Sequence, residues 1–136
     1  MKVLFMTNYP SPYRVDFFNE LGKLCDLDVS FEETPEVQTH RNKNWFHTNY
    51  DNFKPIFLKH FISKHGHCVI SFEIINLIKK NNYDAIIVGM YSTYTAMLAI
   101  MYMRAHKIHY WISSDGGIKK MVMVSKKKLR KKQKKN

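Results

Sequence analysis

The chain has few of the residues that characterise disulfide-rich or membrane proteins. Its 136 residues include two cysteines, Cys25 and Cys68, which could form one bond but make no disulfide framework. The longest apolar run, 96–103, is far shorter than the roughly 20 residues that a membrane helix needs. The N-terminus lacks the apolar region and small-residue cleavage site of a signal peptide. These absences predict a cytoplasmic protein with reduced thiols.

Short motifs for nucleotide and metal binding are also missing. There is no GxGxxG and no Walker loop, so the sequence predicts no cradle for nucleotide phosphates. His60, His65, His67 and Cys68 lie close together in the chain, but their spacing matches no recognised zinc pattern. We interpret this cluster as a polar helix end or loop and expect no metal and no resident cofactor.

Acidic residues are absent from the C-terminal end. Residues 119–136 contain ten Lys or Arg and no acid, whereas residues 1–118 contain twelve Lys or Arg and eleven acids. The formal net charge of +11 therefore belongs mostly to the tail. The tail, 121–136, also lacks the aromatic side chains that nucleic-acid modules add to a basic surface. We expect it to be disordered, with peripheral contact to an anionic membrane surface at the inner face of the cell membrane and no specific nucleic acid.

The chain is 45% apolar, which is enough for a core, and its apolar residues follow both strand and helix periods. Short apolar runs between turn residues predict buried strands at 3–6 and 85–88. The alternating segment 27–31 predicts a strand with one more polar face, and further strands are predicted at 108–112 and, from a weaker pattern, at 55–58. Helices are predicted after the caps Ser11 (with Pro12 at the first position), Ser71, and either Ser92 or Thr93. This order is typical of one α/β domain, 1–120, with a Rossmann-like parallel sheet and helices on both faces.

Two of these helices carry predictions about their buried faces. In the first helix, Tyr13, Phe17 and Leu21 recur every four residues. Phe18 and Leu24 lie beside them, so we expect these five residues to form the apolar face. The helix at 94–105 is apolar nearly all round, which predicts burial on several sides.

Three turns follow strands of the predicted sheet, at 8–13, 89–93 and 113–117. Because the carboxyl ends of parallel strands meet at one edge, we expect these turns to gather where such sheets bind ligands. Their hydroxyls, aromatic faces and few charges would suit a sugar, although such residues also occur in turns for structural reasons alone. The candidate binding residues are Asn8, Tyr9, Tyr13, Arg14, Tyr91, Ser92 and Thr93.

Two further groups of residues have a functional and a structural interpretation. Asp115 could act as a general base toward an acceptor hydroxyl if its pKa is tuned, but a capping Asp in a glycine turn explains it equally well. Arg41 and Trp45 lie in the long polar segment 32–53 and could hold an anionic or stacked ligand. A surface loop with incidental charge is the simpler explanation of that pair.

Four segments together form a pattern that is specific as a whole, although each is weak alone. They are Lys2–Leu24, which contains PSPYRVDFFNEL, then Arg41–Trp45, Tyr83–Val88 with Tyr91 and Ser92, and Ser114–Gly117. This pattern closely resembles bacterial glycosyltransferases of family 4, which have the GT-B architecture. The resemblance covers about residues 1–120.

The resemblance implies a Rossmann-like N-terminal domain that binds the sugar acceptor, facing a second such domain that binds the nucleotide-sugar donor. The implied reaction transfers a glycosyl group to a saccharide or lipid-linked acceptor in surface polysaccharide synthesis, commonly with retention and without metal. By position, three cleft loops would carry Pro12, Tyr13 and Arg14, then Tyr91 and Ser92, then Asp115, Gly116 and Gly117.

The sequence departs from the family after residue 120, where the donor domain and its paired glutamates would follow. A Lys-rich run stands there instead, so we expect a truncated or frameshifted product with little transferase activity of its own. Two alternatives stay open. One is a non-catalytic module that docks a separately encoded donor domain in trans, and the other is a binder of nucleic acid or anionic surfaces through its tail.

Overall fold

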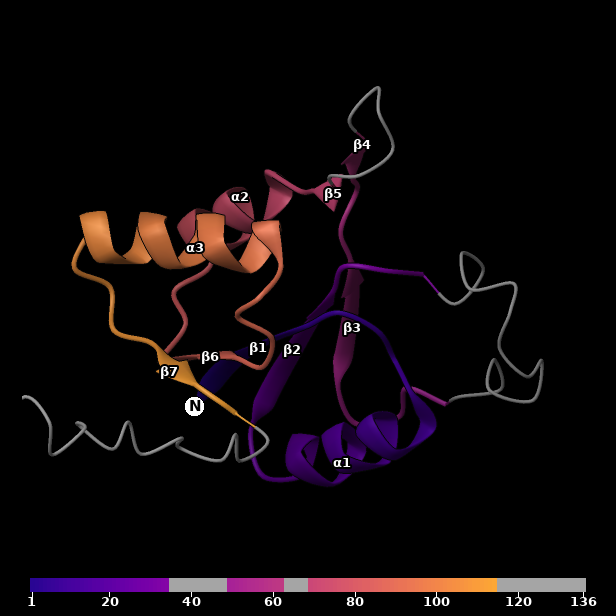
Figure 1. Cartoon of the computed structure of the whole chain (residues 1–136). Coiled ribbons are helices and arrows are strands. Elements are labelled where there is room, and N and C mark those ends of the chain that lie inside the picture. Colours follow the sequence, from indigo (N-terminus) through magenta and orange to yellow (C-terminus); the bar gives the residue numbers. More distant parts are fainter. Residues whose placement is uncertain (35–48, 63–68, 115–136) are drawn as a thin grey trace, which may run out of the picture.

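The computed structural model describes residues 1–34, 49–62 and 69–114. These residues form a five-stranded sheet, a two-stranded hairpin and three helices (Figure 1). The strands are β1 (Lys2–Thr7), β2 (Asp26–Phe31), β3 (Lys54–Phe57), β4 (Phe61–Ile62), β5 (Val69–Ile70), β6 (Ala85–Val88) and β7 (Trp111–Ile112). The helices are α1 (Pro12–Gly22), α2 (Glu73–Lys80) and α3 (Tyr94–Ala105).

The large sheet is parallel throughout, with the strand order β3-β2-β1-β6-β7. The chain builds from β1 to β2 and β3 on one side, then crosses to β6 and β7 on the other. The strand order therefore reverses between β1 and β6, which is where sheets of this kind bind ligands. The predicted Rossmann-like α/β fold is confirmed.

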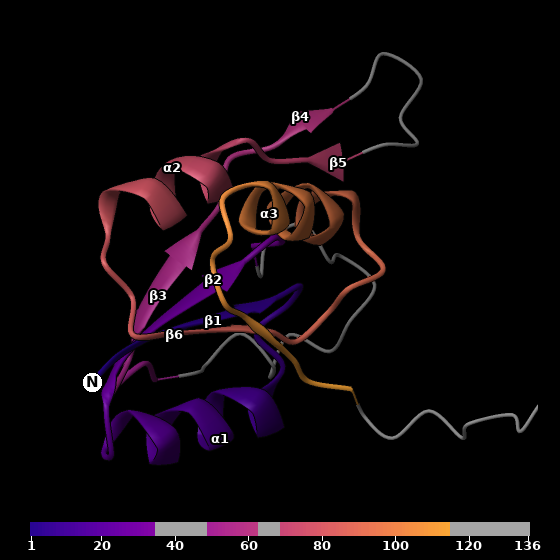
Figure 2. The same ribbon diagram turned by 90° about the vertical axis from the view of Figure 1, so that its left-hand side faces the viewer.

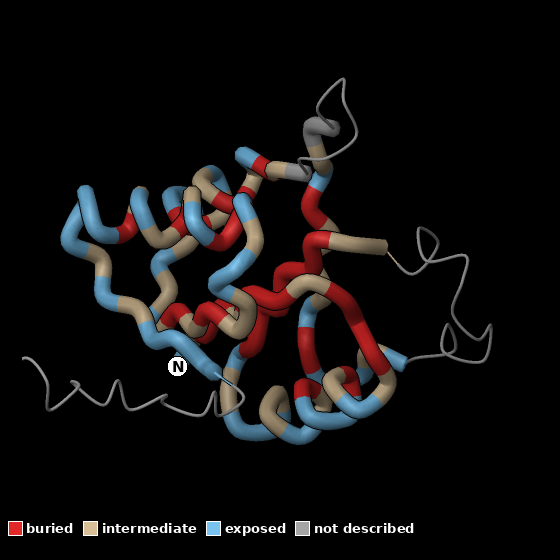
Figure 3. Tube along the Cα trace, viewed as in Figure 1, coloured by how far each residue is buried: buried red, intermediate tan, exposed pale blue. Residues whose placement is uncertain are grey.

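Helices cover both faces of the sheet, as Figures 1 and 2 show: α1 lies on one face, and α2 and α3 lie on the other. The central strand β1 serves both layers because successive side chains point to opposite faces. Val3 and Phe5 pack with the α1 side, whereas Leu4 and Met6 pack with the α2 and α3 side. The buried strands lie between helices whose outer surfaces are exposed (Figure 3).

The strand β2 has polar side chains on one face, and they are buried inside the protein. Asp28 and Ser30 alternate with the apolar residues that face α1, and both are almost fully buried. The Tyr83 hydroxyl donates a 2.7 Å hydrogen bond to the Asp28 carboxylate. Burial, followed by this bond to Asp28, raises the pKa of Tyr83, so the phenol stays neutral and satisfies the buried carboxylate.

The predicted buried face of α1 is wrong in part: Phe18 is buried as expected, but Tyr13, Phe17 and Leu24 are exposed. Val15 and Phe18, three residues apart, are the buried side chains, whereas Tyr13 and Phe17 are 67% and 52% exposed. Leu21 is half-buried against the α1-side cluster. Tyr13 and Phe17, four residues apart, form an exposed aromatic stripe on α1. This stripe is turned away from the core and lies beside the carboxyl edge of the sheet.

The helix caps differ in part from prediction. Thr93 caps α3 by accepting a 3.2 Å hydrogen bond from the Ala96 N–H, as expected. Ser11 occupies the cap position of α1, but its side chain makes no cap bond. Ser71 is not a cap, because α2 begins after Phe72.

Burial of α3 and the length of β7 also differ from prediction. In α3, one side is buried around Ala99 and Met103, whereas Met97 and Met101 on the other side are 50% and 67% exposed. An apolar composition alone therefore does not ensure that a helix is buried on more than one side. The predicted strand at 108–112 is shortened to β7, which pairs with β6 only, and the β4–β5 hairpin was not predicted.

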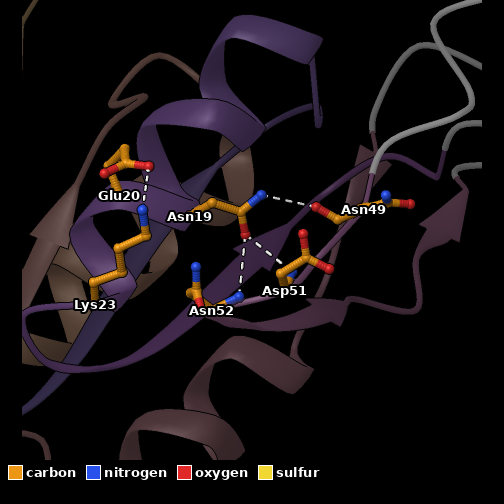
Figure 4. A network of polar contacts seen from close by, with 6 residues as sticks. All are labelled: Asn19, Glu20, Lys23, Asn49, Asp51 and Asn52. Atoms are coloured by element: carbon orange, nitrogen blue, oxygen red, sulfur yellow. Dashed lines mark hydrogen bonds and ion pairs between the residues drawn. The ribbon is translucent and has the colours of Figure 1, made fainter.

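The segment before β3 is attached to α1 through Asn19 (Figure 4). The side-chain oxygen of Asn19 accepts from the backbone N–H groups of Asp51 (3.0 Å) and Asn52 (3.2 Å). Its amide nitrogen donates to the Asn49 carbonyl at 2.8 Å. This attachment holds Phe53 against α1, where its ring packs edge-on against Phe18 with centroids 5.6 Å apart.

Gly22 is required at the end of α1 because the attached segment passes so close. A Cβ atom there would lie 1.9 Å from the Asn52 carbonyl oxygen. Gly22→Ala should therefore lower the free energy of unfolding by about 1–3 kcal/mol, despite the gain in helix propensity. Urea denaturation followed by circular dichroism measures it. Lys23→Ala is the control, since its exposed pair with Glu20 contributes little, and an unchanged midpoint for Gly22→Ala would contradict the expectation.

Candidate functional site

A cavity lies at the carboxyl ends of β1 and β6, beside the start of α1. Its volume is about 320 Å³, at the lower end of the range for small-molecule sites. It coincides with the point where the strand order reverses, so its location and its size both indicate a ligand site. The lining residues are Phe5, Thr7, Tyr13, Arg14, Phe17, Phe18, Gly89 and Ser113.

Aromatic rings form one wall of this cavity. Phe5 contacts Phe18 edge-on with ring centroids 4.9 Å apart, and Phe17 contacts both of them at 6.3 and 5.4 Å. Such edge-to-face packing fixes the rings without a covalent link. The exposed ring of Tyr13 extends this aromatic wall toward solvent.

Gly89, which follows β6, lines the cavity next to Phe5. Its N–H donates a 2.7 Å hydrogen bond to the Met6 carbonyl. A Cβ atom at this position would lie 2.6 Å from a ring carbon of Phe5 and 2.9 Å from the Met6 oxygen. Only glycine therefore allows β6 to pass this close to β1 while the cavity stays open.

Arg14 supplies a positive charge in the wall of the cavity. Its Nη1 atom donates to the Thr7 hydroxyl at 2.5 Å and to the Asn8 side-chain oxygen at 2.8 Å. The guanidinium carbon lies 5.8 Å from the centroid of the Tyr13 ring. Within the described residues Arg14 forms no ion pair. The side chain is thus held in place by neutral groups.

The structure brings part of the predicted first loop together in the cavity. Tyr13 and Arg14 line it, and Asn8 supports Arg14 without being part of the lining. Tyr9 is buried, so its ring belongs to the interior. Pro12 is the first residue of α1 and is half-buried.

The second predicted loop contributes its first residue rather than its later ones. Tyr91 and Ser92 are exposed and are not among the lining residues, and Thr93 is engaged as the cap of α3. Gly89 and Ser113 do line the cavity. The parallel pairing of β1, β6 and β7 therefore brings their turns to one edge, as expected.

Several predicted residues lie outside the described ranges, and so does the basic tail. Asp115, Gly116 and Gly117 are among them, as are Arg41, Trp45, His65, His67 and Cys68. In the described part of the chain, no group of three or more His, Cys, Asp or Glu side chains could hold a metal. Over the same ranges, no helix is long and apolar enough to cross a membrane.

Glu32 is a buried acid at the same edge that the sequence did not single out. It directly follows β2 and accepts a 2.5 Å hydrogen bond from the Thr93 hydroxyl. Burial raises the pKa of the Glu32 carboxyl, and Glu33 adds to this, while the bond from Thr93 opposes it. Glu32 thereby joins the end of β2 to the start of α3. An acid placed immediately after a predicted strand was the available signal.

Most of the lining residues were likewise missed. Phe5 lies within the predicted strand 3–6, Thr7 falls between that strand and the predicted turn, and Phe17 was assigned to the core. Two of these residues could have been found from the sequence. Thr7 directly precedes a turn that was already a candidate, and Phe17 is one helical turn from Tyr13.

The raised pKa of Glu32 makes stability depend on pH. The folded chain keeps the Glu32 proton to a higher pH than the unfolded chain, so the free energy of unfolding falls as pH rises from about 4.5 through the folded-state pKa. Glu32→Gln keeps an oxygen for Thr93 and removes this loss. The variant should gain stability relative to the natural chain between pH 4 and pH 8, as measured by urea denaturation.

Glu20→Gln is the matched control for this experiment, because the Glu20 side chain is 72% exposed. Its stability difference from the natural chain should show no rise over the same pH range. Parallel pH profiles for Glu32→Gln and the natural chain would refute the assignment.

No family assignment follows from comparison with known proteins. Comparisons with protein-family models, curated proteins and solved structures give no match to this chain. The features of this chain that bear on its function are the aromatic cavity, one oriented guanidinium and the hydroxyl groups at the carboxyl edge of the sheet.

Proposed function

We propose that this chain is the acceptor-binding domain of a glycosyltransferase. It binds a saccharide or lipid-linked saccharide, and a second domain would bind the nucleotide sugar that donates the transferred unit. The observation that carries the proposal is the aromatic cavity at the reversal between β1 and β6. The reaction would take place where the acceptor faces the donor.

The chemistry of the lining supports a saccharide. Sugar rings have apolar C–H faces that pack on aromatic side chains, and the rings of Phe5, Phe17 and Tyr13 offer such surfaces. Sugar hydroxyls need donors and acceptors, and the hydroxyls of Thr7 and Ser113 are both. A cavity of about 320 Å³ suits a single sugar unit, from which the rest of the acceptor would extend past Tyr13.

The sequence resemblance to family 4 glycosyltransferases supports the same function. The segment 10–21, which is part of that resemblance, supplies Tyr13, Arg14, Phe17 and Phe18 of the lining. In this proposal Asp115, two residues after Ser113, remains the candidate base that would deprotonate the acceptor hydroxyl.

The proposal predicts that the 136-residue chain binds glycans through its aromatic wall. A glycan panel screened by saturation-transfer NMR should yield saccharides that bind, with affinities then measured by calorimetry. Tyr13→Ala should weaken that binding roughly 2- to 10-fold, because one aromatic contact is lost. Folding should be unaffected, since Tyr13 is largely exposed.

Leu24→Ala is the matched control for Tyr13→Ala. Leu24 is 84% exposed just beyond the other end of α1, so its removal should change neither binding nor stability. Absence of saccharide binding across the panel, or equal loss in both variants, would overturn the proposed function.

A further inference from the structure

The guanidinium of Arg14 offers more hydrogen-bonding capacity than its neighbours use. An arginine has five N–H donors, and both hydrogens on Nη1 are directed to Thr7 and Asn8. Within the described ranges, no acceptor is bound to Nε or Nη2. These two atoms form the planar edge that binds two oxygens of one carboxylate or phosphate.

The orientation of this edge is fixed before any ligand arrives. Thr7 ends β1 and is almost fully buried, and Asn8 follows it directly. Anchoring Nη1 on these two residues removes much of the side-chain freedom that a ligand would otherwise have to restrict. Arg14 is therefore a preorganised donor pair in the wall of the cavity.

The charge of Arg14 also lacks a counter-charge in the part of the chain that the structure describes. Both of its anchors are neutral, and no carboxylate there forms an ion pair with it. A half-buried cation beside Phe5 and Phe17 is poorly solvated, so an anionic ligand would be favoured at this point. The apolar rings would not favour a small, fully hydrated ion alone.

From these observations we infer that the cavity binds a phosphorylated saccharide, with the phosphate on the Nε and Nη2 atoms of Arg14 and the sugar ring on the aromatic wall. This inference rests on the proposed function and names the class of acceptor. The phosphate could belong to a soluble sugar phosphate or to the link between a saccharide and a lipid. Both sources present the same group to Arg14.

The test titrates the natural 136-residue chain with hexoses, hexose 1-phosphates, inorganic phosphate and uridine monophosphate. At least one hexose 1-phosphate should bind about tenfold or more tightly than both its parent hexose and inorganic phosphate, and added salt should reduce the difference. A hexose 1-phosphate ester of a short prenyl alcohol distinguishes the sources. Tighter binding of this ester indicates a lipid-linked ligand, and equal or weaker binding indicates a soluble one.

Variants locate the phosphate. Arg14→Gln should remove the preference for the phosphorylated sugar while leaving weak binding of the parent hexose, and Arg14→Lys should restore only part of it, because lysine lacks the planar pair of donors. Arg104→Gln, in the last turn of α3, is the matched control and should change nothing. In the natural chain, the Nε–H signal of Arg14 should shift on titration, which tests the contact without a variant.

The outcomes separate the two proposals. Equal affinity for hexoses and their phosphates, or an Arg14 Nε–H signal that does not move, would overturn the phosphate inference and leave saccharide binding intact. Tightest binding of uridine monophosphate would indicate a nucleotide site, which overturns both the phosphorylated saccharide and the acceptor function.

Discussion

The parallel pairing of β1 with β2 on one side and β6 on the other is the constraint on which the rest of the structure depends. It sets the alternation that divides β1 between the two apolar clusters, and a shift of one residue would exchange every side chain between the faces. The same register brings Gly89 beside Met6 and thereby forms one wall of the cavity. Core and candidate site thus depend on a single alignment.

The fold was predictable because its signals are local. Short apolar runs bounded by turn residues, such as 85–88, favour buried strands, and their alternation with helical segments implies a parallel sheet. The orientation of α1 was not predictable from spacing. Four-residue and three-residue spacings are both compatible with one face of a helix. The position of the sheet determines that Val15 and Phe18 are buried and that Tyr13 and Phe17 are exposed.

The candidate site was predicted in part for a related reason. Residues of one turn, such as Tyr13 and Arg14, are adjacent in sequence and could be grouped before the structure was known. Phe5 joins them only because α1 folds back over its own preceding strand. The bond between Glu32 and Thr93 connects residues 61 positions apart, a distance over which sequence spacing carries no information.

The walls of the cavity differ in how freely they can change. At Gly89 any larger residue would collide with the neighbouring strand, so this position tolerates no other residue without a shift of the strands. Tyr13 and Phe17 are more than half exposed, so a change at either removes less buried surface than a change at Phe18. Substitutions on the exposed stripe of α1 could therefore change which molecule such a protein recognises, with little loss of stability.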